Sequence, residues 1–397
     1  MKIFLFDTET IHANLLPLSF TRPVADFRCG IVTIREKWEL ELKSPCRFLP
    51  VEYLRDKFGG VEDESETALF IIGNLLPDCR LVEKIKLLQV GFAITKNGEP
   101  LVFKGSWVDF VQQKWCPEEW VEELASIEYV FDLFLKNFDE IRVDFKRLTN
   151  GRESQPTPKC VKVTYSDNEK ANSGLFVEEG ALVECVSINL KDGPVYIGRD
   201  SVIMEGSCVR GPLAVCEGSE LRMGAKVYGG TTIGPHCKVG GEIDNVVMFG
   251  YSNKAHEGYL GNAVIGEWCN IGAGVNASNL KNDYSMIRVW NYKSHTFMHT
   301  DLQFCGLIMG DHSKIGVNCM INTATVIGVG VNIHGSGFPR TYLPNFCEGS
   351  PNTGFSRTPF KKFSEVSDRV MSRRKVYPDD RYKAIYERIY NDSEGCE

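Results

Sequence analysis

The stretch that decides the fold runs from Ile197 to Val239 and reads IGRDSVIMEGSCVRGPLAVCEGSELRMGAKVYGGTTIGPHCKV. Every sixth residue of this stretch is aliphatic: Ile197, Ile203, Val209, Val215, Leu221, Val227, Ile233 and Val239. About one residue in five is aliphatic in an average protein, so chance gives such a run in roughly one placement in 10⁶. The strands of a β-sandwich alternate with period two, so a strict period of six argues against that alternative.

A second position of the repeat, four residues after each aliphatic one, is mostly small: Ser201, Ser207, Leu213, Ser219, Ala225, Thr231, Cys237 and Ile243. The period resumes at Ile265 and Ile271, and again at Ile315, Ile321, Ile327 and Ile333. We interpret each unit as one flat face, with three faces completing a turn of about 18 residues in a left-handed parallel β-helix. The aliphatic side chain then points inward and the small one lets the chain bend. Cysteines at the small positions are accordingly expected to be packing residues.

Two interruptions of the repeat are expected to carry the functional site. The spacing from Val239 to Ile265 exceeds four repeat units by two positions, and the spacing from Ile271 to Ile315 exceeds seven units by two. Loops that leave a rigid scaffold are where binding and catalysis concentrate. We therefore predict an irregular excursion in each gap.

The first excursion contains the residue types that acyl transfer from a thioester to an amine requires. His256 suits the general base, because free imidazole has a pKa of about 6.5. Glu242 is a candidate for the carboxylate that fixes the tautomer of this imidazole. Backbone N–H groups of the turn Gly272-Ala273-Gly274 are candidate oxyanion donors. Lys254 and Glu257 are interpreted as solvated loop charges.

The second excursion, residues 276–311, contains Asn279, Arg288 and the pair His295 and His299. The two histidines are an alternative candidate for a metal site, as in the β-helical carbonic anhydrases. They lack a clear third ligand, which favours a structural interpretation.

A resemblance to a known family rests on three pieces of sequence, His256-x-x-Tyr259-Leu260-Gly261, Ile265-Gly266-x-x-x-Asn270-Ile271-Gly272-Ala273-Gly274 and Asn279. Together they resemble the acetyltransferase domain of the bifunctional glucosamine-1-phosphate acetyltransferase and N-acetylglucosamine-1-phosphate uridyltransferase (GlmU) family, over residues 226–335. The resemblance implies acetyl-coenzyme A as the acyl donor, a small sugar phosphate as acceptor and a homotrimer. It also implies a general base at His256 that Glu242 supports.

The same resemblance implies roles for further residues. It implies sugar-phosphate contacts by Lys226, Tyr259 and Asn270, donor binding by Ala273 and Gly274, and a place near the reacting amine for Asn279. Membership of an asparagine stack inside the coil is the alternative for Asn270. Asp244 and Leu280 depart from the pattern, because the family has a basic residue and a tyrosine there. Acyl transfer is therefore implied more directly than the amino sugar.

Residues 1–165 are predicted to form an α/β, Rossmann-like domain. Ile3–Phe6 and Ala68–Ile72 are expected to be buried strands, and Leu81–Leu88 and Glu118–Lys136 helices. Leu16-Pro17-Leu18-Ser19-Phe20-Thr21-Arg22-Pro23 resembles the segment after the phosphate loop of sugar nucleotidyltransferases. This resemblance implies a nucleoside triphosphate, UTP or dTTP, and Mg²⁺.

The first domain also departs from that family. Asp7-Thr8-Glu9-Thr10 stands where a Gly-rich phosphate loop is expected, and its acids would repel phosphate. Asn74 replaces a metal-binding aspartate. Arg22 and Arg28 remain as candidate phosphate ligands, and Asp7 as a candidate metal ligand. Active nucleotidyl transfer and a degenerate domain kept for structure or regulation both stay open.

The remaining sequence indicates how the chain is organised. We predict a nucleotidyltransferase-like domain at 1–165, a linker over Thr149–Ser173, a β-helix acyltransferase domain at 173–345 and a basic, partly helical tail at 346–397. The tail is interpreted as a solvated segment or trimer clasp, or as a contact for the phosphates of coenzyme A. The alternatives for the whole chain are a nucleotidyltransferase with the coil as scaffold and a non-catalytic trimer that binds a sugar nucleotide.

Composition excludes several classes of protein. The 397 residues carry a net charge of −7, which argues against nucleic-acid binding. No apolar run approaches the ~20 residues that span a bilayer, and no signal peptide is evident, so no membrane partner is expected. The 14 cysteines show no framework spacing, which favours a reduced, cytoplasmic protein.

Overall fold

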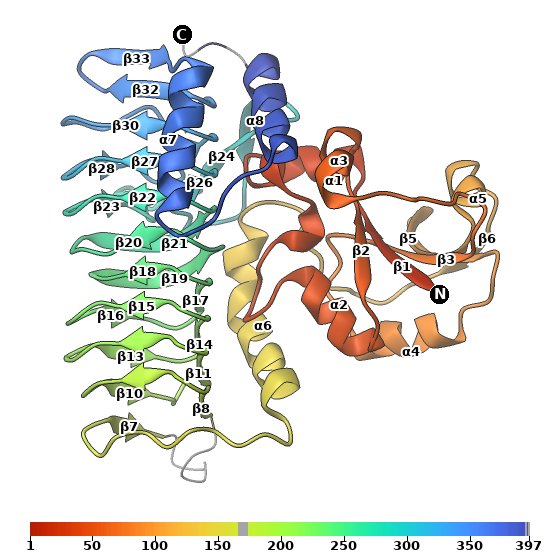
Figure 1. Cartoon of the computed structure of the whole chain (residues 1–397), viewed down its shortest axis with the longest axis horizontal. Helices are drawn as coiled ribbons and strands as arrows, with labels where there is room; N and C mark the ends of the chain where they lie inside the picture. Colours follow the sequence, from red (N-terminus) through yellow and green to blue (C-terminus); the bar gives the residue numbers. More distant parts are fainter. Residues whose placement is uncertain (166–173, 394, 396–397) are drawn as a thin grey trace. The chain divides into compact units, whose positions relative to one another are not determined.

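The computed structural model of the chain describes residues 1–165, 174–393 and 395. Its backbone contacts divide the chain into two compact units (Figure 1). Unit 1 comprises residues 1–15, 19–27 and 32–132, and unit 2 comprises 16–18, 28–31 and 133–397. Part of the expected linker, residues 166–173, lies outside the described residues, as does the expected first residue of the coil.

Unit 1 is an α/β fold built on a six-stranded sheet. Its order is β2-β1-β3-β5-β4-β6, with β1 parallel to β2 and β3 and with β5 antiparallel to β3. Its strands are β1 (Lys2–Phe6), β2 (Cys46–Leu49), β3 (Ala68–Ile72), β4 (Phe92–Lys96), β5 (Glu99–Gly105) and β6 (Cys116–Glu119). Its helices are α1 (Glu9–Asn14), α2 (Ile34–Leu42), α3 (Arg55–Phe58), α4 (Cys79–Leu87) and α5 (Trp107–Val111). The two predicted strands and the first predicted helix are confirmed.

The helix expected over Glu118–Lys136 is wrong for most of its length. Residues up to Glu119 belong to β6, and a helix, α6 (Asp132–Thr149), begins only at Asp132. Between them Ile127 is buried, but its N–H donates to the carbonyl of Asn74 at 2.9 Å, far away in sequence. This long-range backbone bond takes the place of the local helical bond that the apolar spacing suggested.

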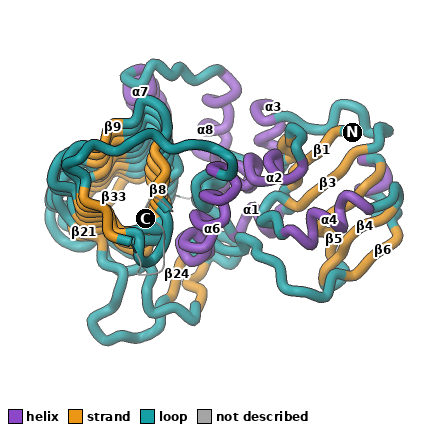
Figure 2. Tube along the Cα trace, turned by 90° about the horizontal axis from the view of Figure 1, so that it is seen from below, coloured by secondary structure: helices purple, strands orange, loops and turns teal. Residues whose placement is uncertain are grey.

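Unit 2 is a left-handed parallel β-helix whose turns stack in register, as Figure 2 shows nearly end-on. Val195 pairs with Leu213 and Leu213 with Thr231, each three repeat units further along the chain. The strands before the hairpin are β7 (Lys162–Thr164), β8 (Leu175–Val177), β9 (Leu182–Val183), β10 (Ser187–Asn189), β11 (Val195–Ile197), β12 (Val202–Ile203), β13 (Cys208–Arg210), β14 (Leu213–Val215), β15 (Glu220–Leu221), β16 (Lys226–Val227), β17 (Thr231–Ile233), β18 (Lys238–Val239), β19 (Glu242–Met248), β20 (Asn253–Lys254), β21 (Tyr259–Ile265), β22 (Asn270–Ile271) and β23 (Asn276–Ala277).

The rest of unit 2 completes the coil and adds helices. The strands that follow are β24 (Arg288–Asn291), β25 (Thr296–His299), β26 (Ile308–Met309), β27 (Lys314–Ile315), β28 (Met320–Ile321), β29 (Val326–Ile327), β30 (Asn332–Ile333), β31 (Tyr342–Leu343), β32 (Cys347–Ser350) and β33 (Gly354–Arg357). The tail forms α7 (Phe360–Ser372) and α8 (Asp380–Asp392). Among the described residues, no helix combines the length and apolar character needed to cross a membrane.

The interior of the coil confirms the six-residue repeat. The eight aliphatic positions from Ile197 to Val239 are at most 3% exposed, and the eight small positions from Ser201 to Ile243 are fully buried. The small side chains tie turns together: the hydroxyl of Ser219 accepts the N–H of Cys237 and donates to the carbonyl of Gly234. Burial raises the pKa of the Cys237 thiol to about 12, which fits a packing residue.

The first interruption of the repeat is not an excursion from the coil, contrary to our prediction. β19, β20 and β21 remain in parallel register, with Lys238 paired to Asn253 and Glu242 paired to Tyr259. A full turn of three units separates paired residues by 18 positions. The first pair is three positions closer than this and the second is one position closer, so these turns are shortened. The shift brings Lys254 opposite Val239, inside the coil, where it is fully buried. Lys254 is therefore not a solvated loop charge.

The second interruption is an excursion as predicted. It leaves the coil after β23 and returns at β26, and its antiparallel strands β24 and β25 form a hairpin. Arg288 pairs with His299 in this hairpin, and Trp290 stacks on Tyr342 of the coil with ring centroids 4.1 Å apart.

Helices of unit 2 cover the coil in two places. The amide of Asn137 in α6 donates to the carbonyl of Gly230 at 2.7 Å and accepts from the hydroxyl of Thr232 at 3.1 Å. α7 and α8 pack through aromatic rings, with Phe363 and Tyr386 both edge-on to the ring of buried His312. The tail is thus part of the folded unit.

Asp7 follows β1 directly and is partly buried in unit 1. Its Oδ2 accepts the N–H of Val24 at 3.1 Å, while its Oδ1 faces Gly73 and has no hydrogen-bond partner among the described residues. Burial raises the pKa of this carboxyl from 3.8 to about 7. The fold therefore favours the protonated acid.

This shift makes the stability of unit 1 depend on pH. Because the folded pKa lies above the unfolded one, the favourable contribution present below about pH 4 is lost as the pH rises toward 7. The variant D7N keeps an acceptor for Val24 without the charge. We expect D7N to exceed the wild type in free energy of unfolding at pH 8, by a few kcal/mol at about 1.4 kcal/mol per pKa unit, and by much less at pH 4.5. Urea unfolding at both pH values checks this, and an equal difference at both would contradict it.

The interior column of the coil gives a second prediction. Leu221 is fully buried, whereas Met223, two residues later, is 68% exposed. Truncating a buried leucine leaves a cavity, so we expect L221A to lose about 2–5 kcal/mol of unfolding free energy. The matched control M223A should stay within about 0.5 kcal/mol of the wild type. Equal losses in the two variants, measured by denaturant unfolding, would show that the column does not hold the coil together.

Candidate functional site

The imidazole of His256 stands at a corner of the coil between β20 and β21. The corner directly below it is Gly240-Gly241. A Cβ built on Gly240 would lie 2.6 Å from the carbonyl oxygen of Ala255, and Gly241 has φ +77°. Only glycine permits this approach without displacing the backbone. The two corners are therefore in close contact, and the side chain of His256 is exposed above them.

The cavity beside this corner has a volume of about 770 Å³. The predicted site residues His256, Asn270 and Ala273 all line it. Asn270 is exposed on the outside of the coil, so it does not belong to an internal asparagine stack. Three residues that were chosen from the sequence for one reaction thus share one cavity.

The turn that forms part of this cavity leaves one donor available. The N–H of Gly272 donates to the carbonyl of Ile315, and that of Gly274 to the carbonyl of Glu257. Within the described part of the chain, no acceptor takes the N–H of Ala273. An unused backbone donor that lines a cavity can hold a developing oxyanion.

Positive charge dominates the lining of the cavity. Five cations contribute to it and no carboxylate does; the cations are Arg222, Lys238, Lys314, Arg373 and Arg374. Glu220, outside the lining, pairs with Lys238 at 2.7 Å and with Arg222 at 3.0 Å. Burial lowers the pKa of Lys314. The cavity is suited to an anionic ligand such as a polyphosphate.

A second group of predicted residues lies on the neighbouring face of the coil. Lys226, Glu242 and Tyr259 are register partners on three successive turns. The ammonium of Lys226 pairs with Glu257, beside His256, at 3.6 Å. Across the residues that the structure describes, no hydrogen bond joins Glu242 to His256. The proposed base and its proposed carboxylate are therefore close in the fold but not paired in this state.

Asn279 lies at the far end of that face. Its amide nitrogen donates to the hydroxyl of Tyr259 at 2.9 Å and to the Oδ1 of Asn262 at 2.7 Å. Burial raises the pKa of Tyr259 to about 12, with Asp244 adding to the shift, so the phenol stays neutral. Asn279 does not line the cavity of His256.

The excursion shows no metal centre. Among the described residues, no group of three histidine, cysteine, aspartate or glutamate side chains lies close enough to hold a metal ion. A separate cavity of about 650 Å³ lies between the base of the excursion and the coil and includes Arg288 and Leu280.

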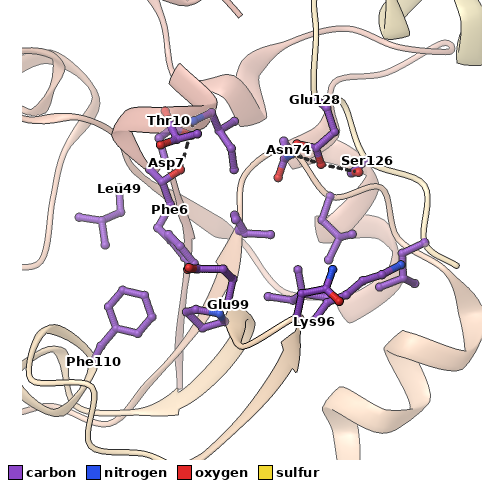
Figure 3. A pocket seen from close by; sticks show the side chains of 18 of the residues that line it. Phe6, Asp7, Thr10, Leu49, Asn74, Lys96, Glu99, Phe110, Ser126 and Glu128 are labelled. Carbon is purple, nitrogen blue, oxygen red and sulfur yellow. Dashed lines mark hydrogen bonds between the residues drawn. The ribbon is translucent and has the colours of Figure 1, made fainter. Parts of the chain in front are cut away.

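Unit 1 has a cavity of its own, also about 770 Å³, at the carboxyl ends of β1 and β3 (Figure 3). Asp7 lines one side; on the other, Glu128 accepts hydrogen bonds from Asn74 at 3.1 Å and from Ser126 at 2.7 Å. Four carboxylates and two cations line this cavity: Asp7, Glu99, Glu123, Glu128, Arg55 and Lys96. Its charge is the opposite of that of the cavity in unit 2.

The two arginines predicted to bind nucleotide phosphate lie elsewhere. Arg22 is buried and 4.0 Å from Asp26, and it does not line the cavity of unit 1. Arg28 belongs to unit 2, where its guanidinium donates to the carbonyl of Ile31.

Sequence reasoning missed several lining residues. Lys238 and Lys314 each stand directly before an interior aliphatic residue, an outward position of the repeat. The register places Asn253 and Asn270 between them, so the pattern predicts an outward polar column that includes two lysines. The aromatic wall of the unit 1 cavity, with Trp107, Phe110 and Trp115, had no comparable signal, because its members come together only in the folded sheet.

Comparison with known proteins yields a family match and a curated relative. Residues 3–153 match the family model described as sugar nucleotidyl transferase. The bifunctional protein GlmU of Trichodesmium erythraeum is 27% identical over 140 residues, 35% of this chain and 25% of that protein. The match thus spans a quarter of the length of this curated relative.

Solved structures give weaker likenesses. The polysialic-acid-specific acetyltransferase NeuO covers 53% of this chain and 97% of its own at 15% identity and a TM-score of 0.27. The UDP-N-acetylglucosamine acyltransferase of Francisella novicida covers 56% of this chain and 72% of its own at 10% identity and a TM-score of 0.27. TM-scores this low leave the function to be argued from the chain's own residues. The chain is similar to GlmU, with a sugar nucleotidyl transferase match at residues 3–153.

Proposed function

We propose that the chain is an acetyl-coenzyme A-dependent N-acetyltransferase whose acceptor is an amino sugar 1-phosphate, glucosamine-1-phosphate. The observation that carries the proposal is the shared cavity of unit 2. It combines an exposed imidazole at His256, an unused N–H at Ala273 and five cations without a carboxylate. Acetyl transfer from coenzyme A requires each of these: a base, an oxyanion donor and a site for phosphates.

The reaction follows from this placement. The amine nitrogen attacks the thioester carbonyl carbon while the imidazole of His256 takes a proton from the amine. The carbonyl oxygen becomes an oxyanion that the N–H of Ala273 stabilises. As the C–S bond breaks, the electron pair leaves with sulfur, and the imidazolium returns the proton to the thiolate. The products are an N-acetyl sugar phosphate and free coenzyme A.

The remaining predicted residues take supporting roles in this proposal. Lys226 and Tyr259 contact the sugar phosphate, together with Asn270. Glu242 orients the imidazole once substrate orders the corner, because catalytic hydrogen bonds often tighten only in the complex. Gly274 shapes the donor turn. Asn279 lies near the reacting amine, as predicted from the resemblance, and also positions the hydroxyl of Tyr259 through its hydrogen bond.

We propose the following division of labour along the chain. Residues 1–165 form the nucleotidyltransferase-like region, 173–345 the acyltransferase coil and 346–397 a tail that contributes Arg373 and Arg374 to the donor site. The resemblance to GlmU supports a cytoplasmic homotrimer that takes small-molecule substrates. The alternatives are a nucleotidyltransferase with the coil as scaffold and a non-catalytic trimer that binds a sugar nucleotide.

A second candidate activity, nucleotidyl transfer that yields UDP-N-acetylglucosamine, is favoured by the family match to residues 3–153. The residues of unit 1 do not fit a resident Mg²⁺ site. One oxygen of Asp7 is taken by Val24 and the other faces Gly73, Asn74 is neutral, and the described residues contain no cluster of three ligands. A magnesium-dependent step is therefore not part of the proposal.

The proposed function predicts the products of the purified protein. Given acetyl-coenzyme A, UTP, dTTP, Mg²⁺ and a panel of hexosamine 1-phosphates, the wild type should yield an N-acetyl sugar phosphate by mass spectrometry. H256A should lower kcat by about 10²–10⁴-fold, the usual contribution of a general base. The control H334A removes an exposed histidine just after β30, outside the cavity, and should leave kcat unchanged.

Each other outcome selects a different function. Absence of acetyl transfer from the wild type contradicts the proposal. Nucleotidyl transfer alone would select the scaffold alternative, and inertness toward every substrate would select the non-catalytic trimer.

The cationic lining predicts how the donor is recognised. We expect the double variant R373A/R374A to raise the KM for acetyl-coenzyme A about tenfold or more while leaving the KM for S-acetylpantetheine, which lacks the nucleotide phosphates, unchanged. K375A, a neighbouring cation outside the lining, is the matched control. If the double variant affects both donors equally, the phosphates lie elsewhere.

A further inference from the structure

A lysine inside the apolar core of the coil is unexplained by the fold alone. Lys254 pairs in register with Val239, a core residue, and Asn253 pairs with Asn270, the residue before core residue Ile271. Lys254 is fully buried. Its two neighbours in this column, Val239 and Ile271, are at most 2% exposed. Burying an ammonium is unfavourable unless it is hydrogen-bonded, so an aliphatic side chain would be the expected occupant.

The ammonium of Lys254 reaches the corner that carries His256. It donates to the carbonyl of His256 itself, and at 3.4 Å to the carbonyl of Gly240 in the corner below. One side chain therefore bonds two successive corners from inside the coil. A residue with an apolar stem and a single charged tip is suited to this, because the stem fills the core position.

The other contacts of this corner involve Glu257 and not the carbonyl of His256. On the outside Glu257 pairs with Lys226 at 3.6 Å, and the carbonyl of Glu257 accepts the N–H of Gly274. The carbonyl of His256 has no other donor among the described residues. The backbone of the imidazole-bearing residue is therefore fixed by Lys254, and its neighbour by the outer contacts.

We propose that Lys254 is a positioning residue that holds the backbone of His256 in the orientation needed for proton transfer from the acceptor amine. The inference rests on the proposed function for its catalytic consequence, but the positioning itself is a property of the corner. A displacement of about 1 Å at a reacting group can lower a rate by about 10²-fold, so loss of one bond here is expected to be felt in kcat.

The variant K254M tests the proposal without opening the core. Methionine fills nearly the same volume, and the melting temperature should change little, because removal of a buried charge offsets the loss of its two hydrogen bonds. We expect kcat for acetyl transfer to fall at least tenfold, with the KM for acetyl-coenzyme A within twofold because the cationic lining is intact. I203M places a methionine in the same column three turns away, outside the lining of the cavity, and is the matched control that should keep the kcat of the wild type.

A readout that does not require turnover separates this proposal from the proposed function. The rate at which diethyl pyrocarbonate modifies His256, followed by peptide mass spectrometry, reports the environment of the imidazole. K254M should change that rate at least threefold, with His334 as internal reference and with the rate in I203M unchanged. If the wild type transfers no acetyl group, the proposed function fails while this measurement still decides the positioning. Wild-type kcat and an unchanged modification rate in K254M would overturn it.

The wild type provides a test should K254M fail to fold. Burial lowers the pKa of Lys254 to about 8, and Glu257, the one charged group found to act on it, opposes the shift. Deprotonation removes the charge and one N–H donor and so weakens the bonds to both corners. The N–H groups of Gly240, Glu242 and Gly274 donate to the carbonyls of Lys254, Gly258 and Glu257, so their exchange reports the order of this corner. Corrected for intrinsic rates, these three amides should lose protection between pH 7 and 9, whereas the amide of Lys238, which donates to Ser252, should not. Constant protection of the three amides across this range would contradict the proposal.

Discussion

The parallel stacking of successive turns is the constraint on which the structure of unit 2 depends. Each turn satisfies its backbone N–H and C=O groups with the turns above and below, so the turns must match in length and register. The aliphatic side chains from Ile197 to Val239 also fill a narrow core between the three faces. Freedom to vary is left at the corners and on the outward positions, and the candidate site is built there.

The shortened turns around Asn253 show how function enters such a scaffold. Closing a turn one or three positions early keeps the parallel pairing but alters which residue falls inside. Lys254 then occupies a core position, and His256 emerges at the next corner above a pair of glycines. The departure shortens the turns by only a few residues, but it replaces an aliphatic contact in the core by a hydrogen bond from a charged side chain.

The repeat in the sequence predicted the coil because each six-residue unit forms one flat face, so the period of six follows directly from the three-sided turn. Buried strands β1 and β3 were predictable for a similar reason, since a short uninterrupted apolar run is typical of a strand that is covered on both faces. The helix expected from Glu118 failed because its apolar spacing serves long-range contacts, such as that of Ile127 with Asn74. The same limit applies to the candidate site. His256, Asn270 and Ala273 were predicted from motifs. For the basic tail the sequence left open a solvated segment, a trimer clasp or a contact with the coenzyme A phosphates, and only the fold showed that Arg373 and Arg374 line the cavity of His256.

Charge separates the two cavities. The cavity of unit 1 has more carboxylates than cations, while that of unit 2 has five cations and no carboxylate in its lining. Under the proposed function, this difference in charge directs an anionic acyl donor to unit 2. A crystal structure of the protein with bound coenzyme A tests this account most directly. The account predicts that the sulfur lies beside the N–H of Ala273 and the imidazole of His256, with the phosphates on the cations of the same cavity. Coenzyme A bound away from this corner, or with its sulfur remote from His256, would contradict it.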